Sequence, residues 1–329
     1  MYHYEYKGQQ INTKHHYDLS DEQFNKLKQE YYSKPDFCEV EKELKRLKDG
    51  GIKISEIKKY YVKDLMAKVR LNKCRWTIED VFNCKDLLGV FVSKISKNKK
   101  VFPPEKSTIS NIESSFRLGG VPICRTPSNF PLKTALDILD KYNINNNWYD
   151  FSCGWGVRLI SALVKNVNYY GTDPNFELTE RLNQLGNDYN KVNNENNQFK
   201  IFTQGSEKFI PELENKIGLA FSSPPYFKLE MYNVGEQSCD EDTEYKIWLK
   251  EYLYPTIYNI RKYLIDEGYL LININNYGKY QLVEHTKFIT ERSGFELVGY
   301  ETLNNTSKRV NVKGGLNDNS EKIIVFKKK

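Results

Sequence analysis

One short segment combines residue types that suit hydrogen bonding to a planar group: Ser223-Pro224-Pro225-Tyr226-Phe227. It follows the apolar run Ile217–Ser222, which is typical of a buried strand. Two consecutive prolines fix the backbone torsions and remove two N–H donors, so the segment presents rigid carbonyl groups where the strand ends. A hydroxyl precedes the prolines and two aromatic rings follow them. Such a segment could accept hydrogen bonds from a planar amino group. One of its aromatic rings could stack on the base that carries this amino group.

An exocyclic amine of adenine or cytosine is a weak nucleophile because its lone pair is delocalised into the ring. The Ser223 hydroxyl and the Pro224 carbonyl would accept the amine hydrogens and direct the lone pair at an electrophilic methyl group. Tyr226 would stack on a base flipped from the duplex, since the target atom is out of reach inside the stack. Carbon-5 methylation of cytosine uses an attacking cysteine, usually just after a proline. The chain has no Pro-Cys dipeptide, so we expect direct transfer.

A second segment, Asp150-Phe151-Ser152-Cys153-Gly154-Trp155-Gly156, follows an expected strand and precedes an expected helix over Val157–Lys165. Its glycines allow a sharp turn and the close approach of a ligand to the backbone and the helix start. The next expected strand ends at Asp173, whose carboxylate could accept both hydroxyls of a ribose. A nicotinamide dinucleotide and S-adenosylmethionine both fit these two elements.

A third strand end carries Gly205-Ser206-Glu207. Ser206 could supply a hydrogen bond to an adenine ring, whereas a solvated turn is the other reading for Glu207. The six cysteines form no C-x-x-C pair and have no histidine at a zinc-like spacing, so we expect reduced, mostly buried thiols and no metal site.

Short apolar runs alternate with amphipathic helices from about residue 120 onward, which predicts a doubly wound, mostly parallel α/β sheet. A last pair of strands, separated by a polar loop, predicts an antiparallel hairpin at the sheet edge. Short asparagine-rich stretches read as turns. The expected strands are Trp148–Ser152, Tyr169–Asp173, Phe199–Thr203, Ile217–Ser222, Gly268–Asn275, Phe295–Leu303 and Lys322–Lys327.

The first hundred residues instead predict helices, over Asp21–Tyr32, Val40–Lys48, from Ser55 to Arg70, and from a Thr77 cap through Leu87. A linker is expected from Lys97 through Pro104. We therefore predict a helical domain over 1–105 and a catalytic domain over 106–329. Residues 1–100 hold 22 Lys and Arg against 15 Asp and Glu, so this basic excess indicates either a face for a polyanion or a solvated helical surface.

Together these segments resemble the amino-methyltransferases of DNA, which carry an Asp-Pro-Phe-x-Gly-x-Gly loop and an (Asn/Asp/Ser)-Pro-Pro-(Tyr/Phe/Trp) loop. Asp150, Cys153, Gly154 and Gly156 match the first, and Ser223 through Tyr226 match the second. Phe151 and Ser152 replace the usual Pro and Phe, and Trp155 is bulkier than the common residue. The stretch Arg125–Pro131, with Asn129 and Phe130, looks like the family's additional motif at the methionine end of the cofactor.

The resemblance implies a Rossmann-like methyltransferase fold over roughly 120–329, with S-adenosylmethionine as cofactor and DNA as partner. A serine at the first position of the catalytic loop is more similar to N4-cytosine enzymes than to N6-adenine enzymes. Target recognition would fall to residues 1–110 or to two later loops, Lys228–Glu244 and Asn304–Ser320.

Two other functions fit the same residues. One is a methyltransferase acting on RNA or on a protein glutamine, because the same acceptors serve any planar amine. The other is a catalytically degenerate nucleic-acid-binding protein with this fold. The N-terminus lacks an apolar stretch for secretion, and no long apolar run occurs, so we expect a cytoplasmic protein without a membrane segment.

Overall fold

The structure is a computed structural model that describes residues 2–14, 16–98, 108–118, 123–232, 235–302 and 322–329. It divides into two compact units. The first, here the helical unit, comprises Met1–Asp36, Val62–Ser128 and Glu230–Val234. The second, the sheet unit, comprises Phe37–Tyr61, Asn129–Leu229 and Gly235–Lys329.

This division differs from the predicted boundary at residue 105. Residues 37–61 group with the sheet because their helices pack on a sheet helix: Tyr61 donates its hydroxyl to Asp188 Oδ2 at 2.6 Å, and Asn193 Nδ2 donates to the Leu44 carbonyl at 3.4 Å. The sequence carries no signal for such long-range contacts.

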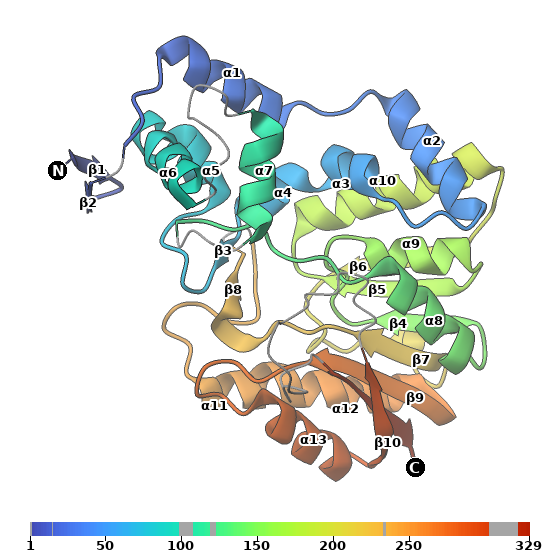
Figure 1. The fold of residues 1–329 in the computed structure, drawn as a ribbon. Helices are drawn as coiled ribbons and strands as arrows, with labels where there is room; N and C mark the ends of the chain where they lie inside the picture. Colours follow the sequence, from blue (N-terminus) through green and yellow to red (C-terminus); the bar gives the residue numbers. More distant parts are fainter. Residues whose placement is uncertain (1, 15, 99–107, 119–122, 233–234, 303–321) are drawn as a thin grey trace, which may run out of the picture. The chain divides into compact units, whose positions relative to one another are not determined.

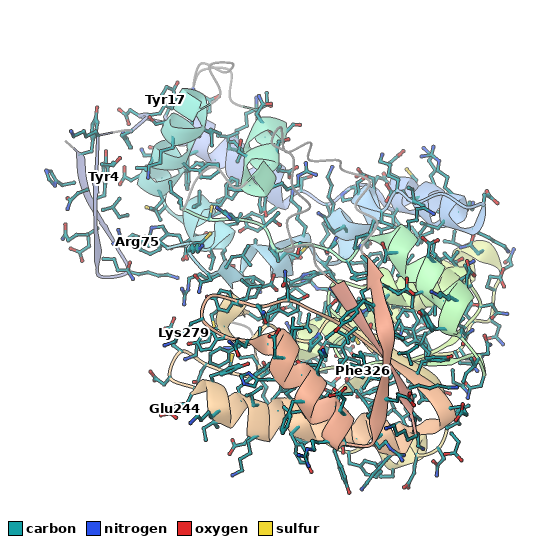
Figure 2. All side chains as sticks on the ribbon, turned by 60° about the horizontal axis from the view of Figure 1, so that its bottom comes forward. Tyr4, Tyr17, Arg75, Glu244, Lys279 and Phe326 are labelled. Atoms are coloured by element: carbon teal, nitrogen blue, oxygen red, sulfur yellow. The ribbon has the colours of Figure 1, made fainter. Side chains whose placement is uncertain are left out.

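The helical unit opens with an antiparallel hairpin that the sequence analysis missed, β1 with β2. Arg75, labelled in Figure 2, holds the hairpin by donating to the Gln9 side chain at 2.9 Å and the Gln10 carbonyl at 2.7 Å. The elements of this unit are β1 (Tyr2–Tyr6), β2 (Gln9–Thr13), α1 (Asp21–Tyr32), α4 (Lys63–Ala67), β3 (Arg70–Leu71), α5 (Ile78–Asn83), α6 (Lys85–Asn98), α7 (Ile109–Leu118) and β8 (Glu230–Met231).

Two helix predictions for the first hundred residues need correction. The helix expected from Ser55 to Arg70 is two helices, α3 (Ser55–Tyr61) and α4, followed by strand β3. Ser55 does not cap α3; the buried Glu43 carboxylate does, by accepting from the N–H groups of Glu56 at 2.8 Å and Ile57 at 3.0 Å. A distant side chain thus replaces the local cap.

The Thr77 cap is confirmed, as a capping box with Asp80, but α5 ends at Asn83 and a new helix, α6, starts at Lys85. Helix α1 has the predicted bounds. Lys97 and Asn98 belong to α6 and not to a linker, and the rest of the expected linker lies outside the described residues.

The sheet unit contains a seven-stranded sheet in the order β10-β11-β9-β7-β4-β5-β6. Five adjacent strands, from β9 to β6, pair in parallel, while β11 runs antiparallel to both β9 and β10. The predicted doubly wound, mostly parallel sheet, with its antiparallel C-terminal hairpin, is confirmed. The strands are β4 (Asn147–Asp150), β5 (Asn168–Asp173), β6 (Phe199–Thr203), β7 (Ile217–Ser222), β9 (Leu264–Ile274), β10 (Phe295–Thr302) and β11 (Lys322–Lys328).

Helices cover both faces of the sheet, as Figure 1 shows, with α8, α9 and α10 on one face and α12 and α13 on the other. The helices of this unit are α2 (Phe37–Lys48), α3, α8 (Leu132–Tyr142), α9 (Val157–Val164), α10 (Phe176–Asn193), α11 (Tyr245–Trp248), α12 (Tyr254–Tyr263) and α13 (Leu282–Arg292), with short turns η2 (Pro211–Leu213), η3 (Phe227–Leu229) and the π-helix η4 (Leu249–Leu253). Within the described residues, no helix is both long and apolar enough to cross a membrane.

The core of the sheet unit is aromatic. Trp148 of β4 stacks on Phe221 of β7 at 5.8 Å and donates its indole N–H to the Phe221 carbonyl at 3.0 Å. Phe326 of β11, labelled in Figure 2, is fully buried in a second cluster, together with Tyr149 of β4 and Ile257 of α12. This packing fixes the strands whose ends carry the polar residues discussed below.

The turns that lead into four of the parallel strands, β4, β5, β6 and β7, share one feature. Each contains an asparagine with a left-handed φ: +61° at Asn146, +51° at Asn166, +51° at Asn194 and +50° at Asn215. Asparagine tolerates this conformation better than other residues with a side chain. The asparagine-rich stretches are therefore turns, as predicted.

Candidate active site

The carboxyl ends of the five parallel strands meet at one edge of the sheet. Three of the predicted segments follow neighbouring strands there: the glycine loop follows β4, Asp173 ends β5, and Ser223 follows β7. Ligands of open α/β sheets bind at this edge. The fold therefore brings the predicted cofactor and catalytic segments to the same edge.

Asp150, at the end of β4, is fully buried and is held by two side chains. Arg158 Nε donates to its Oδ2 at 2.9 Å, and the Tyr169 hydroxyl donates to the same oxygen at 2.8 Å. Burial opposes the charged form of Arg158, but the Asp150 carboxylate leaves the guanidinium pKa raised. These two bonds thus hold Asp150 in place at the start of the glycine loop.

Arg158 also joins the cofactor segment to the catalytic strand. Its Nη2 donates to the Ser152 carbonyl and, at 3.3 Å, to the hydroxyl of Ser222, the last residue of β7. The Ser222 hydroxyl in turn donates to the Ser152 carbonyl at 3.2 Å. One buried cation therefore links the loop after β4 to the residue before Ser223.

The two glycines of the loop have different roles. Both have positive φ, +55° at Gly154 and +84° at Gly156. A Cβ at Gly156 would lie 2.7 Å from Leu182 Cδ2, so this glycine lets α9 pack on α10. A Cβ at Gly154 would meet nothing closer than 3.5 Å. Gly154 therefore has no tightly packed neighbour, and its positive φ is the reason for a glycine at this position.

The other loop residues differ in exposure. Phe151 and Cys153 are buried, while Ser152 and Trp155 are half-buried. Burial raises the pKa of the Cys153 thiol well above its usual value, so the thiol stays protonated and is a poor nucleophile. Phe151 belongs to the buried core of the sheet unit.

Asp173 ends β5 and is half-buried. Burial raises the pKa of its carboxyl to about 7, although hydrogen bonds from the N–H groups of Asn175 and Gly154 act against this shift. Without a ligand, the carboxyl therefore titrates near neutral pH. The bond from Gly154 also ties this carboxyl to the glycine loop.

Ser206, predicted to contact an adenine, is buried, and its hydroxyl lies 2.9 Å from Thr256 Oγ1. The Glu207 side chain folds back over Gly205, and Asn259 Nδ2 donates to the Glu207 carbonyl at 2.9 Å. Helix α12 thus holds this turn through Thr256 and Asn259.

Phe130, from the stretch predicted for the methionine end, packs its ring at 5.3 Å from Phe221 and 5.9 Å from the Arg158 guanidinium. It therefore lies beside the glycine loop. The neighbouring Asn129 has a buried Oδ1 that, within the described part of the chain, has no hydrogen-bond partner.

The catalytic segment is held by the neighbouring strand β9. Asn273 Nδ2 donates to Ser223 Oγ at 2.9 Å. Pro224 is buried, while Pro225 and Tyr226 are half-buried. The Ser223 oxygen retains a second lone pair, so it can accept one further hydrogen bond.

Phe227 does not share the position of Tyr226. It is buried among Tyr245, Trp248 and Tyr280, at ring distances of 5.3, 5.8 and 4.9 Å, with a left-handed φ of +54°. Such a backbone is strained for an aromatic residue and requires support from its surroundings. Of the predicted aromatic pair, only Tyr226 can face a substrate.

The two predicted recognition loops are described only in part. In Lys228–Glu244, Asp240 Oδ1 accepts from the N–H groups of Asp242 and Thr243, and Cys239 donates to the Phe227 carbonyl at 3.4 Å. Asn304–Ser320 lies outside the described residues. Among the residues that are described, no group of three or more His, Cys, Asp or Glu could hold a metal ion.

Three contributors to this edge were missed by the sequence analysis: Arg158, Asn273, and Tyr252, whose hydroxyl lies 3.5 Å from Ser152 Oγ. A signal existed for Arg158, which is the only charged residue in the otherwise apolar helix Val157–Val164. Tyr252 and Asn273 lie far along the chain from their partners, so no local pattern marks them.

No protein-family model and no curated protein matches the chain. Solved structures do. One is a TehB-like SAM-dependent methyltransferase from Corynebacterium glutamicum, 17% identical over 59% of this chain and 87% of that one, with a TM-score of 0.39. Another is a putative rRNA-methylase from Clostridium thermocellum, 11% identical over 61% and 98%, with a TM-score of 0.41.

A third is a magnesium protoporphyrin IX methyltransferase from Synechocystis PCC 6803 with bound SAM, 12% identical over 60% of this chain and 78% of that one, with a TM-score of 0.40. At these identities and TM-scores, the likeness carries no argument about cofactor or substrate.

Proposed function

We propose that the protein is an S-adenosylmethionine-dependent methyltransferase that acts on an exocyclic amino group in DNA, N4 of cytosine or N6 of adenine. The observation that carries the proposal is the hydrogen bond from Asn273 to Ser223 Oγ at 2.9 Å. It orients a hydroxyl acceptor in a rigid proline turn, on the strand next to a glycine loop.

Three features of the edge fit the cofactor. Gly154 has no tightly packed neighbour, and Asp173 offers a carboxylate for ribose hydroxyls. The partnerless Oδ1 of Asn129 would accept from the amino group of the methionine half. When bound, S-adenosylmethionine supplies an electrophilic methyl group, and its transfer to an amine releases one proton and leaves S-adenosylhomocysteine.

The protein's own groups would act by orientation. Ser223 accepts one amine hydrogen while Asn273 holds its oxygen in place. The Tyr226 ring stacks on the base, and the buried, strained Phe227 fixes the direction in which Tyr226 leaves the turn. The Cys153 thiol, kept neutral by burial, takes no part as a nucleophile.

The test is incubation with isotope-labelled S-adenosylmethionine and unmethylated genomic DNA, followed by nucleoside mass spectrometry. We expect labelled N4-methylcytosine or N6-methyladenine, formed far more slowly with Ser223→Ala. Label in added RNA or protein alone would favour the RNA or glutamine reading. Calorimetry with S-adenosylhomocysteine distinguishes an enzyme from a catalytically degenerate nucleic-acid-binding protein. Absence of binding would favour the degenerate protein.

For DNA contact we propose exposed lysines of the helical unit, such as Lys14, Lys26 and Lys73. Deleting residues 1–100 is a poor test because it removes α2 and α3 from the sheet unit. Replacing the three lysines by glutamine should instead reduce the slope of log affinity against log salt by about 0.9 per lost phosphate contact. An unchanged slope would mean that these lysines are only solvated.

A further inference from the structure

Strand β9 supports the first residue of the catalytic loop, Ser223–Phe227, and then enters a tight turn. Asn273, near the end of the strand, donates to Ser223 Oγ at 2.9 Å. The turn is closed by two backbone hydrogen bonds: the Tyr277 N–H donates to the Tyr280 carbonyl at 3.2 Å, and the Tyr280 N–H donates to the Tyr277 carbonyl at 2.9 Å. A left-handed φ of +57° at Gly278 allows so short a turn. The position of Tyr280 is therefore fixed relative to the strand.

Tyr280 contacts the last residue of the same loop. Its ring lies edge-on to the ring of Phe227, with the centroids 4.9 Å apart and the planes at 76°, a favourable geometry for an aromatic pair. The Tyr280 ring also lies 4.8 Å from that of Tyr245 and 6.1 Å from that of Tyr277. Strand β9 and the turn after it thus hold both ends of the catalytic loop, Asn273 the first and Tyr280 the last.

Phe227 needs such support because its backbone is strained. Its φ of +54° lies in the left-handed region, which a residue keeps only where its surroundings over-determine it. The Phe227 side chain is fully buried, and Cys239 Sγ donates to its carbonyl at 3.4 Å. Tyr226 directly precedes it. A relaxed Phe227 would therefore change the direction in which the Tyr226 ring leaves the loop.

We propose that Tyr280 is a positioning residue for methyl transfer: its ring holds Phe227 in the strained conformation and thereby keeps Tyr226 directed at the substrate base. The inference rests on the proposed function, since it presupposes that Tyr226 stacks on a base. The ring of Tyr280 carries this role, and not its hydroxyl, because the contact with Phe227 is between two rings.

A matched control lies on the same strand. Tyr269 of β9 is half-buried like Tyr280, and its ring lies edge-on to Tyr142 at 5.1 Å and 66°. Each tyrosine ring also has a lysine ammonium near it, Lys279 at 5.8 Å for Tyr280 and Lys327 at 5.9 Å for the control. Leucine at either position removes an edge-on ring contact and a cation–π contact, so both changes should lower the melting temperature. Only Tyr280→Leu should loosen the catalytic loop.

The first measurement is hydrogen exchange of the ligand-free protein, resolved at the Leu229 N–H. This group donates to the Tyr226 carbonyl at 3.2 Å and so reports on the end of the loop. Tyr280→Leu should speed its exchange roughly three- to tenfold, as expected for the loss of one aromatic contact. Tyr269→Leu and Tyr280→Phe should leave the exchange rate within about twofold of wild type, on the same scale.

The second measurement is steady-state methylation of unmethylated genomic DNA at saturating S-adenosylmethionine. Tyr280→Leu should lower kcat roughly three- to tenfold, because the base is less well oriented, while the affinity for S-adenosylhomocysteine stays unchanged. Tyr280→Phe should retain the wild-type kcat. Combined with Tyr226→Ala, Tyr280→Leu should have no further effect on kcat, because it acts through Tyr226.

The inference is overturned if Tyr280→Leu exchanges and methylates like the wild type, or if Tyr269→Leu changes both measurements equally. A low kcat in Tyr280→Phe, or a further loss of kcat when Tyr280→Leu is added to Tyr226→Ala, overturns it as well. If Tyr280→Leu does not fold, Tyr280→Met replaces it, because methionine fills irregular gaps in a core.

The outcome for the wild type separates this inference from the proposed function. If the wild type transfers no methyl group to DNA, the proposed function fails, and the inference fails with it. If the wild type is active and only the results expected for Tyr280 are missing, the proposed function stands and the inference alone is wrong.

Discussion

The two edges of the parallel sheet use different turn residues. At the amino edge, asparagines in left-handed conformation precede four of the strands. Two further asparagines, Asn145 and Asn147, donate from their amides to the Lys216 carbonyl at 2.9 and 3.1 Å. At the carboxyl edge, glycines and the strained Phe227 take the left-handed positions, and buried side chains bond to one another. At the amino edge, asparagine amides bond to backbone carbonyls. At the carboxyl edge, a buried ion pair and a strained residue shape the candidate site.

The largest effect expected at the carboxyl edge concerns its buried ion pair. Arg158→Leu leaves the Asp150 carboxylate buried without its cation, which should cost about 3–5 kcal/mol of unfolding free energy. Urea denaturation followed by circular dichroism measures it. If the variant unfolds at the wild-type midpoint, the ion pair does not support this edge, and the proposed contrast between the edges is lost.

The next effect is on methyl transfer. Ser223→Ala should lower kcat about 10²- to 10³-fold, because the loss of an oriented acceptor raises the barrier, while S-adenosylhomocysteine binds as before. Asn273→Ala should lower kcat less, since Ser223 remains but is no longer held. Steady-state kinetics with equilibrium binding separates the two parameters. If Ser223→Ala weakens only the binding of S-adenosylhomocysteine and leaves kcat unchanged, Ser223 contacts the cofactor and not the amino group of the base.

A third prediction concerns pH. With its pKa at about 7, Asp173 is protonated below that pH in the ligand-free protein. Ribose hydroxyls donate to the ionised form, so affinity for S-adenosylhomocysteine should rise about tenfold from pH 6 to pH 8, with proton release on binding. Calorimetry in buffers of different ionisation enthalpy measures the released proton. Asp173→Asn should give a flat profile, and a sloping one would place the titrating group elsewhere.

The same shift makes a prediction for folding. Because the folded pKa of Asp173 lies above its unfolded value, stability declines as pH rises from about 4 to about 7, and Asp173→Asn should remove that decline.

The smallest expected effect is at the amino edge. Asn166 is exposed with φ of +51°, so Asn166→Ala should destabilise the protein by about 1 kcal/mol through its backbone alone. Asn166→Gly should be close to neutral. Neither should change ligand affinity, as measured alongside thermal unfolding. Any loss of binding in Asn166→Ala would show that the two edges are coupled.

Local patterns in the sequence determined much of this protein. Apolar runs predicted all seven strands of the large sheet because burial on both faces leaves a continuous signal, and the Thr77–Asp80 capping box marked a helix start because its bonds span three residues. The glycine loop and the proline turn were recognisable for the same reason: their constraints lie within a few consecutive residues.

Only the tertiary structure decided how these segments meet. Three contacts join residues that lie 50 to 100 positions apart, so no periodicity encodes them: Arg158 with Ser222, Asn273 with Ser223, and Tyr252 with Ser152. The division of roles between Gly154 and Gly156 likewise follows from the packing of α10 and not from their spacing. Sequence marks where the chain can turn, and the packing of the sheet decides what each turn faces.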